Sequence, residues 1–393
     1  MVNSSVVLSA VRTPIGKFGG ALSKKTAVEL ATVAVKEALL RANVPAEAVD
    51  LVLVGQARQA GNGPNPARQV AIASGIPQSA TAWTLNQACA SGLAAIDQAH
   101  KALLLGDAEV VVAAGMESMS RVPYLLENAR WGLRLGHDQL TDAMYKDGLF
   151  CPMSGVVMGE TVEGLVDEFG LTREEQDEYA AQTQARCQAA REAGRFQDEI
   201  VAVELKKGAR LEKDEHPRDN VTAAGLASMA PVYKLAKRTG TITAANASGI
   251  TDGASALVLT TAAKAREMGW ETFATYQGGV TVGLEPQRMG LGPVHAVEAL
   301  LKKRPDLSLE SFDLVELNEA FAAQVLACLK SLPIASERLN VNGGSIALGH
   351  PIGCSGNRIS VTLLHELRRR GGGLGLATLC VSGGLGIAGV FKV

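Results

Sequence analysis

Several features that mark common protein classes are missing from this sequence of 393 residues. Its six cysteines include no CxxC pair, so neither a zinc-finger pattern nor a disulfide-stabilised scaffold fits. It has no apolar run of about 18 residues, the length that a membrane-spanning helix needs. The first strand pattern, Val6–Val11, begins without a signal peptide, and Phe391–Val393 is not a peroxisomal signal. We therefore expect a cytoplasmic protein without a membrane span.

Concentrated charge is also missing. The 38 basic and 40 acidic residues give a formal net charge of −2, and no long block of one sign occurs. A nucleic-acid-binding surface normally needs clustered basic residues, so we expect no nucleic-acid partner. The short run Arg368–Arg370 ends a helix pattern, where cations stabilise the carboxyl end of a helix.

The chain is instead rich in apolar residues and glycine. Hydrophobic residues make up 47% and charged residues 20%, which is typical of a soluble globular protein. The length exceeds the ~250–300 residues at which a single core stops growing, so at least two core-forming units are expected. The 42 glycines form no Gly/Ser tract and therefore indicate tight turns and close backbone contacts.

Strand patterns alternate with helix patterns, which predicts an α/β fold with a parallel or mixed sheet covered on both faces. The predicted strands include Asp50–Val54, Thr84–Leu85, Val110–Ala114, Leu257–Thr260 and Leu376–Cys380, and the predicted helices include Ala27–Arg41, Gly92–Leu105 and Thr172–Ala190. Residues 121–240 are more polar and rich in loops. We interpret them as an insertion.

An internal repeat divides the chain. Asp50 stands 41 residues before Ser91, and Asp313 stands 42 residues before Ser355; an apolar strand pattern follows each aspartate and a glycine follows each serine. Repeated spacing of this kind indicates duplicated βα units. We predict three domains. They are an N-terminal core of residues 1–120 continued by about 241–270, an inserted loop domain of residues 121–240, and a C-terminal core of residues 271–393.

Cys89 is the first candidate for a reactive group. It lies just before the helix pattern that starts near Gly92, where backbone dipoles lower the pKa of a thiol and favour the thiolate. Most cysteines are buried and inert, but the small residues Ser91 and Gly92 leave room for a reactant above this sulfur. The sequence therefore predicts a reactive thiolate at this turn.

Three other polar groups lie near strand ends or in a glycine-rich loop of the second half. His350 stands among five glycines from Gly343 to Gly356, Cys380 ends a buried strand before a glycine-rich turn, and Asn318 ends another strand. Ligands of open α/β sheets bind at the carboxyl ends of strands. We therefore expect these groups to meet Cys89 in one site.

Four motifs around these residues resemble the thiolase family: NxxCxSG around Cys89, NEAF at Asn318–Phe321, GHPxGxSG at Gly349–Gly356 and CxxGG at Cys380–Gly384. They have the family's order and spacing, and the likeness covers essentially the whole chain. It implies a layered α-β-α-β-α fold whose two duplicated βα core domains have mixed central sheets. It also implies a reversible Claisen condensation of acyl-CoA with acetyl-CoA, or the CoA-dependent thiolysis of a 3-ketoacyl-CoA.

The resemblance assigns a role to each group. Cys89 would carry the acyl group as a thioester after His350 takes its proton, and Cys380 would remove the α-proton of acetyl-CoA. Asn318 would hold a water near the enolate oxygen, beside His350. The backbone N–H groups of Cys89 and Ser382 would form a second oxyanion hole.

The resemblance also implies how substrate is held. CoA would contact Ser248, the inserted-domain residues Leu149 and Met158 and, at its nucleotide phosphate end, Arg218. CoA and acyl-CoA are substrates, so no cofactor and no metal is expected. The family forms homodimers or homotetramers, and the same is expected of this chain.

Three positions depart from the family pattern. Ser382 replaces a usual glycine, so its Cβ is expected to strain the backbone or crowd the acyl group. Val157 stands where short-chain members often carry histidine, and Gly164 replaces a common asparagine. These replacements leave the acyl-chain length open.

Three alternatives use the same residues or the same fold. One is a metal site made of Cys89, His350, Cys354 and Cys380, although no pair has zinc-finger spacing. Another is a non-catalytic acyl-CoA-binding or lipid-carrier protein, which would be expected to lack a catalytic group. The third, a decarboxylating ketoacyl synthase, would pair its cysteine with two histidines, or with histidine and asparagine. A thioester on Cys89 would exclude the carrier.

Overall fold

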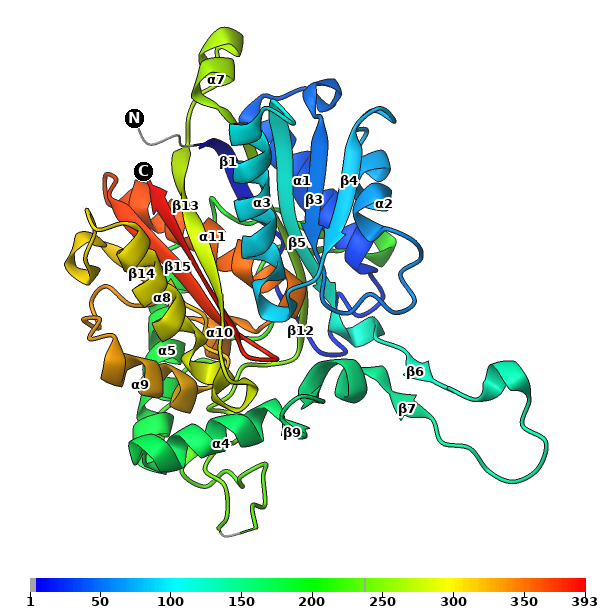
Figure 1. Cartoon of the computed structure of the whole chain (residues 1–393), viewed down its shortest axis with the longest axis vertical. Coiled ribbons are helices and arrows are strands. Elements are labelled where there is room, and N and C mark those ends of the chain that lie inside the picture. The colour runs from blue at the N-terminus through cyan, green and yellow to red at the C-terminus, as the bar shows by residue number, and fades with distance from the viewer. Residues whose placement is uncertain (1–4, 237) are drawn as a thin grey trace.

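The computed structural model describes residues 5–236 and 238–393. Its centre is a ten-stranded mixed sheet in the order β14-β15-β16-β13-β1-β12-β5-β3-β4, with β2 paired to β12 (Figure 1). The strands are β1 (Ser5–Arg12), β2 (Gly16–Lys17), β3 (Leu51–Gly55), β4 (Thr81–Leu85), β5 (Val110–Ser118), β12 (Thr251–Thr261), β13 (Ala274–Gly283), β14 (Leu314–Leu317), β15 (Leu374–Val381) and β16 (Leu385–Lys392).

The two halves of this sheet repeat one pattern. In the N-terminal half, β3 runs parallel to β5, and β5, β12 and β1 follow antiparallel to one another. In the C-terminal half, β14 runs parallel to β15, and β15, β16 and β13 follow antiparallel. The duplicated α/β fold predicted from the repeat is confirmed. The structure adds that β1 and β13 pair, so that the two mixed sheets are continuous.

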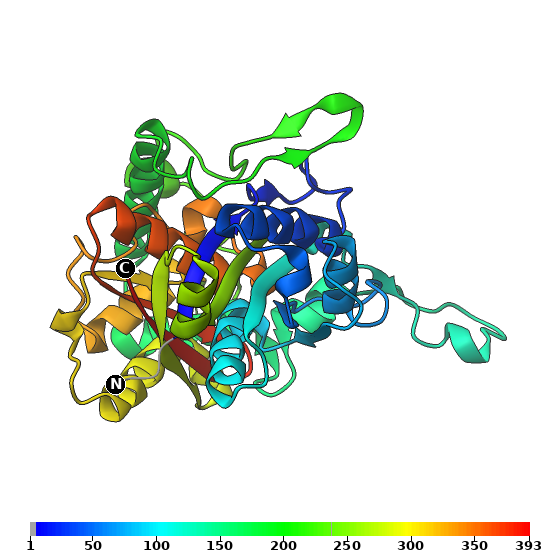
Figure 2. The ribbon, with the colours of Figure 1, turned by 90° about the horizontal axis from the view of Figure 1, so that it is seen from above.

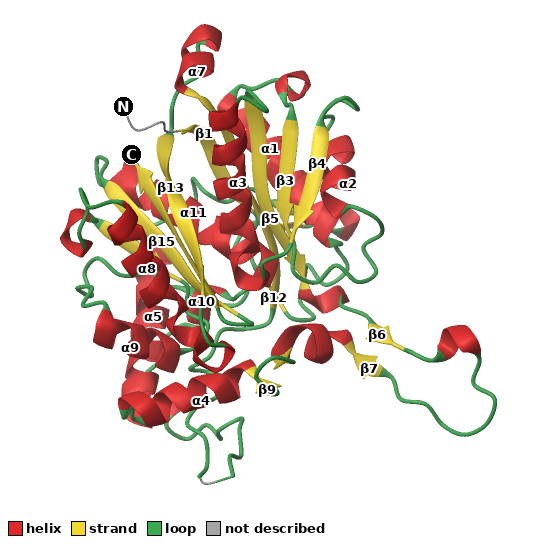
Figure 3. Cartoon of the chain, viewed as in Figure 1, coloured by secondary structure: helices red, strands yellow, loops and turns green. Residues whose placement is uncertain are grey.

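Helices form three layers around the two half-sheets (Figures 1 and 3). α1 and α2 pack on the N-terminal half, α8 packs on the C-terminal half, and α3 and α11 lie side by side between the two. Apolar side chains of α3 and α11 share one core with the inner faces of both half-sheets. The helices are α1 (Ala27–Ala42), α2 (Pro66–Ala73), α3 (Ser91–Leu105), α8 (Gly292–Lys303) and α11 (Ile352–Arg369).

Two glycines allow the inner helices to touch at their starts. A Cβ atom at Gly92 would lie 2.6 Å from the backbone nitrogen of Asn357, and one at Gly356 would lie 2.5 Å from the backbone nitrogen of Leu93. These distances are too short for a real Cβ, so any larger residue would push the helices apart. The contact is reciprocal, as a duplicated unit requires. It brings the turn before α3 next to the loop before α11.

The insertion lies between β5 and β12. In Figure 1, β6 and β7 form an arm that extends away from the rest of the molecule. Figure 2 shows β10 and β11 as a separate hairpin, and its Val203 belongs to the core around α1. α5 begins after the predicted capping box of Thr172 and Glu175. The elements are β6 (Tyr124–Leu125), β7 (Thr141–Asp142), β8 (Phe150–Cys151), β9 (Val156–Val157), α4 (Met158–Phe169), α5 (Arg173–Glu192), β10 (Val203–Glu204), β11 (Arg210–Leu211) and α6 (Ala223–Leu226).

Three further helices complete the fold. α7 (Ala262–Met268) follows β12, α9 (Ala322–Ser331) follows the NEAF segment, and α10 (Ser345–Leu348) precedes the His350 loop. No helix within residues 5–236 and 238–393 is long and apolar enough to cross a membrane.

Arg12, at the end of β1, is fully buried and ties the insertion to the sheet. Its Nε donates to Glu199 at 2.6 Å, and its terminal nitrogens donate to Asp214 at 2.7 and 3.0 Å. Burial alone would lower the pKa of Arg12, but the charges of Asp214 and Glu199 raise it overall. Removal of the guanidinium would leave two buried carboxylates unpaired.

Replacement of Arg12 by methionine is expected to lower the free energy of unfolding by about 3–5 kcal/mol, the usual cost of leaving a buried charge without its partner. Arg304→Met is the control, because Arg304 pairs with the exposed Asp306 and does not contact the insertion. That control is expected to lose about 1 kcal/mol. Urea denaturation measures the free energy of unfolding of both variants. Equal small losses would show that Arg12 does not hold the insertion to the sheet.

Candidate active site

Cys89 lies in a short 3-10 turn, Ala88–Ala90, between β4 and α3. Ala88 has a φ of 45°, in the left-handed region that residues with a side chain rarely adopt. Its N–H donates to Asn86 Oδ1 at 2.9 Å, and its carbonyl accepts from the Ser91 hydroxyl at 2.7 Å. These bonds hold the strained turn. Of the six cysteines, Cys89 alone is partly exposed.

His350 is the side chain that faces this sulfur. Its Nε2 lies 3.3 Å from Cys89 Sγ, and its Nδ1 lies 2.6 Å from the Ser355 hydroxyl oxygen. That hydroxyl also donates to the Pro351 carbonyl at 3.0 Å. A hydroxyl has one hydrogen, so when it donates to the carbonyl it accepts from Nδ1–H. Nε2 is then the unprotonated nitrogen, free to accept a proton from the thiol.

Burial decides the charge of both groups. Desolvation, together with the charges of Arg358 and Arg58, lowers the pKa of His350 to about 3. Desolvation also raises the pKa of Cys89, and Arg58 and the backbone N–H groups of Ser382 and Cys89 offset this only in part. The prediction that the helix start lowers the pKa of Cys89 is therefore wrong, because the loss of water around the sulfur outweighs the dipoles. At neutral pH a neutral thiol faces a neutral imidazole.

The turn after β15 completes the surroundings of the sulfur. The backbone N–H groups of Ser382 and of Cys89 itself lie near Cys89 Sγ and lower the pKa of the thiol. The left-handed residues of this turn are Gly383 and Gly384, with φ of 85° and 83°, and Ser382 has no positive φ. Ser382 therefore occupies a position usual for glycine without the expected backbone strain.

Cys380 and Asn318 come from the C-terminal half. Burial raises the pKa of Cys380 well above its ordinary value, and the neighbouring Cys89 raises it further. Asn318 is buried and accepts from the Ser345 hydroxyl at 2.7 Å through Oδ1. Ser345 in turn accepts from Arg358, which fixes the direction of the amide. Asn318 Nδ2 has no hydrogen-bond partner within the described residues, so it can donate to a water or a substrate oxygen.

The Ser248 loop adjoins this centre. The carbonyl of Gly249 accepts from the backbone N–H of His350 at 3.0 Å, and the Ser248 N–H donates to the Ala320 carbonyl at 2.9 Å. Arg218 is exposed and lines a small pocket that also includes Ala244 and Ala245 from the start of this loop. The structure thus brings Ser248 to the His350 side of the site and places Arg218 farther out, at the surface.

Leu149 and Met158 lie at either end of a short hairpin. Leu149 ends a π-helix, Tyr145–Leu149, and Met158 begins α4; both side chains are half-buried. The β8–β9 hairpin between them packs against the turn after β15, where the side chain of Met153 lies 2.8 Å from the place of a Cβ on Gly383. The structure therefore links both residues to the turn that carries Ser382.

Sequence reasoning gave no role to Glu117, Ser355 or Arg58. Glu117 is fully buried and accepts from the backbone N–H groups of Ala57, Arg58 and Gly353 at 3.0, 3.1 and 2.9 Å. It thereby ties the loop after β3 to the start of α11. Arg58 lies in the same loop and is the strongest influence that lowers the pKa of Cys89. The available signal was a charged residue near the carboxyl end of a buried strand, because Glu117 lies within β5 and Arg58 stands three residues after β3.

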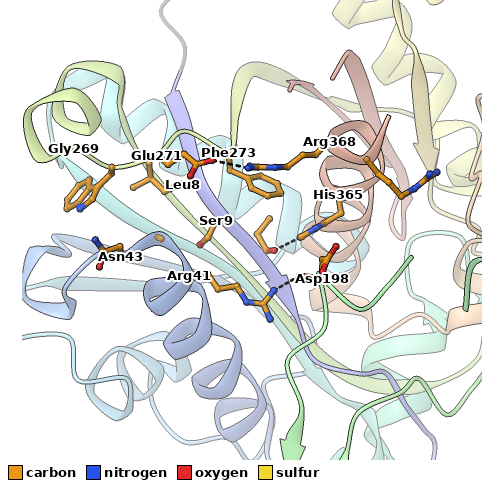
Figure 4. Close-up of a pocket in the computed structure, with 14 residues that line it drawn as sticks. Leu8, Ser9, Arg41, Asn43, Asp198, Gly269, Glu271, Phe273, His365 and Arg368 are labelled. Atoms are coloured by element: carbon orange, nitrogen blue, oxygen red, sulfur yellow. Dashed lines mark hydrogen bonds and ion pairs between the residues drawn. The ribbon is translucent and has the colours of Figure 1, made fainter. Parts of the chain in front are cut away.

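Two other sites are less suitable. Cys354 Sγ lies 3.2 Å from Ser255 Oγ, and no group of three or more His, Cys, Asp or Glu side chains within residues 5–236 and 238–393 is placed to hold a metal ion. A separate pocket of about 620 Å³ lies between the ends of α1 and α11 (Figure 4). Its Arg41, His365 and Arg368 are engaged by protein groups, and no motif residue lines it.

Iodoacetamide is expected to modify Cys89 before the other cysteines, because the other five are buried. The reaction should be slow at neutral pH, and its rate should rise about tenfold between pH 7 and 8, because alkylation requires the thiolate. Peptide mass spectrometry measures the site and the rate. A rate that stays constant over this range would show that the thiolate is already present, against the raised pKa.

Comparisons with known proteins agree over the full length. Residues 5–263 match the model of the thiolase N-terminal domain, and residues 270–393 match that of the thiolase C-terminal domain. The acetyl-CoA acetyltransferase of Cupriavidus necator is 46% identical over 98% of both chains, and that of Chromobacterium violaceum is 47% identical over 97% of both.

Solved structures agree as well. The acetyl-CoA acetyltransferase of Bacillus anthracis has a TM-score of 0.95 at 45% identity, covering 100% of this chain and 99% of its own. Human mitochondrial 3-ketoacyl-CoA thiolase in complex with CoA has a TM-score of 0.95 at 41% identity, covering 100% and 98%. The chain therefore belongs to the thiolase family.

Proposed function

We propose that this thiolase, an acyltransferase, condenses an acyl-CoA with acetyl-CoA to a 3-ketoacyl-CoA and free CoA, and runs the reverse thiolysis. The arrangement around Cys89 is the observation that carries the proposal. His350 Nε2 lies 3.3 Å from its sulfur, and the backbone N–H groups of Ser382 and Cys89 lie near the same atom and lower its pKa. A base, a nucleophile and donors for a developing oxyanion therefore meet at one position.

In the first half-reaction, His350 Nε2 accepts the proton of Cys89 while the sulfur attacks the thioester carbon. Negative charge develops on the carbonyl oxygen, where the N–H groups of Cys89 and Ser382 stabilise it. The intermediate then releases CoA, whose sulfur takes the proton from His350. The pKa of His350, lowered to about 3, makes this return of the proton favourable.

In the second half-reaction, Cys380 first gives its own proton to solvent, and its thiolate removes the α-proton of acetyl-CoA. The enolate carbon attacks the acyl group on Cys89, a carbon–carbon bond forms, and the Cys89 sulfur leaves as a thiolate. That thiolate takes a proton from solvent, so both cysteines return to the neutral thiol. A water on Asn318 Nδ2 and His350 stabilise the enolate oxygen.

We further propose that CoA binds between the Ser248 loop and the insertion. Leu149 and Met158 contact the pantetheine side, and Arg218 contacts the nucleotide phosphates. Their positions support this order, because the Ser248 loop bonds to His350 whereas Arg218 is exposed. The solved complex of human 3-ketoacyl-CoA thiolase with CoA is a further support. CoA and acyl-CoA are substrates, so the enzyme needs no cofactor and no metal.

The setting of the enzyme is also a proposal. We place it in the cytoplasm, in fatty-acid metabolism. We also propose three domains: an N-terminal core of residues 1–120 and about 241–270, an insertion of residues 121–240, and a C-terminal core of residues 271–393. The match to separate N- and C-terminal thiolase models, which divide between 263 and 270, supports the last boundary. Similarity to both acetyl-CoA acetyltransferases and a 3-ketoacyl-CoA thiolase is compatible with short or longer acyl chains.

Two cysteine variants separate the half-reactions. Cys380→Ser is expected to form an acetyl thioester on Cys89 with acetyl-CoA but to lose condensation and thiolysis by roughly 100- to 10,000-fold, the usual contribution of a general acid–base group. Cys89→Ala is expected to form no thioester. Intact-protein mass spectrometry detects the adduct, and the CoA-dependent loss of acetoacetyl-CoA measures thiolysis.

The matched control is Cys187→Ser, because Cys187 is equally buried but packs in the insertion against Phe196 and Leu348, away from Cys89 and Cys380. It is expected to retain the adduct and the turnover, after correction for any loss of folded protein. Wild-type protein that binds CoA without forming an adduct would support the non-catalytic carrier instead.

Two surfaces support a homodimer or homotetramer. β4 is the last strand of the sheet, pairs within the described residues with β3 alone, and exposes Trp83. The β6–β7 arm, which extends from the molecule in Figure 1, exposes Trp131 and Leu135. Open strand edges and exposed apolar side chains are typical of subunit contacts.

Sedimentation velocity is expected to give a particle of two or four chains. If the arm joins two dimers, the double variant Trp131→Ser and Leu135→Ser will sediment as a dimer and keep its thiolysis activity. A wild-type monomer at micromolar concentration would contradict both surfaces. If the wild-type protein and the arm variant both sediment as dimers, β4 is the subunit contact.

A further inference from the structure

Arg58 is a buried cation that makes no ion pair within the described residues, although its charge acts on the buried Glu117. It follows β3, and only 8% of its surface is exposed. Its backbone N–H is held by Glu117, but its side-chain Nε has no hydrogen-bond partner within residues 5–236 and 238–393. In the same part of the chain, no carboxylate oxygen lies within 4.0 Å of the guanidinium. An unpaired buried charge is costly, so a compensating group is expected when the enzyme works.

The guanidinium lies close enough to the reacting end of the site for its charge to act on both Cys89 and His350. It also packs against the π-helix, because a Cβ atom on Gly148 would lie only 2.7 Å from Arg58 Nε. Glycine at this position therefore leaves the space that the guanidinium occupies. Arg218, at the surface, is the residue proposed for the CoA phosphates, so Arg58 lies at the opposite end of the substrate.

The surroundings of Arg58 suit a substrate with a charged end. Ala57, Met119, Met144 and Ile352 form a small apolar cluster that packs against Cys89. These side chains suit the methylene groups of an acyl chain, and Arg58 adjoins Ala57. Glu117 is the nearest acidic influence, but its carboxylate already accepts three backbone N–H groups.

We infer that Arg58 binds a carboxylate at the far end of the acyl group, and that the preferred 3-ketoacyl-CoA substrates carry such a carboxylate. This rests on the proposed thiolase reaction and adds a substrate class to it. The carboxylate supplies the partner that the guanidinium lacks, in a bidentate pair that arginine forms well. Arg58 thereby determines specificity without taking part in the bond changes at Cys89.

The test compares thiolysis of 3-oxoadipyl-CoA and 3-oxohexanoyl-CoA, whose acyl groups have equal length and differ in the terminal carboxylate. Wild-type enzyme is expected to have the higher kcat/KM for 3-oxoadipyl-CoA. Arg58→Met is expected to lower that value roughly 100-fold, the usual effect of removing one partner of a buried charge pair. Its kcat/KM for 3-oxohexanoyl-CoA should fall much less, because that substrate loses only the effect of the Arg58 charge on Cys89 and His350. The ratio of the two kcat/KM values therefore decides the test.

Two variants complete the design. Arg58→Lys keeps the charge and should retain part of the preference, and it serves as the test if the methionine variant fails to fold. Arg68→Met is the matched control, because Arg68 donates only to the carbonyls of Ala80 and Gln78. It should leave the ratio of the two kcat/KM values unchanged.

Two results would overturn the inference. One is a wild-type preference for 3-oxohexanoyl-CoA. The other is an equal loss with both substrates in Arg58→Met, with a shifted pH profile, which would mean that Arg58 acts on the Cys89 thiolate instead. Acetoacetyl-CoA is assayed in parallel. Its thiolysis by wild-type enzyme separates a failure at Arg58 from a failure of the proposed function, which would abolish all three reactions.

Discussion

The contact between the starts of α3 and α11 is the constraint on which the site depends. Gly92 meets the backbone of Asn357, Gly356 meets the backbone of Leu93, and a Cβ on Gly55 would lie 2.4 Å from the carbonyl carbon of Ser91. These are contacts with backbone atoms, which cannot move away by a rotamer change as a side chain can. The 3.3 Å between Cys89 and His350 therefore follows from two helix starts, one from each half of a duplicated chain, that pack without side chains between them.

That close packing also sets the electrostatics. Excluding water raises the pKa of both thiols and lowers that of His350, so the catalytic groups rest without charge. Negative charge then arises one step at a time and meets donors that are already in place, namely the N–H groups of Cys89 and Ser382 and the amide of Asn318. Fixed donors of this kind need no reorganisation when charge develops.

The sequence was sufficient for the fold and for the meeting of Cys89 with His350, because strand and helix periods, repeat spacing and glycine motifs are local signals. The roles of Cys380, Asn318 and Ser382 rest on the family resemblance and remain predictions. The pKa of Cys89 was predicted in the wrong direction, since a helix start is visible in a sequence whereas the segments that cover it are not. Arg58 was overlooked for a related reason. A single arginine in a loop is normally solvated, and only the packing against Gly148 buries it.

Burial therefore gives Arg58 its significance. Two other buried charges near the core have fixed partners: Arg12 has Glu199 and Asp214, and Glu117 has three backbone N–H groups. Arg58 departs from this pattern. It lies near the acyl end of the substrate, which is the part that differs from one thiolase reaction to another. An enzyme can tolerate such a cation when the partner arrives with the substrate, because the pair then forms only in the complex and its formation discriminates between acyl groups. Specificity is thus expected at the wall beside Gly148 rather than at the surface that holds the nucleotide.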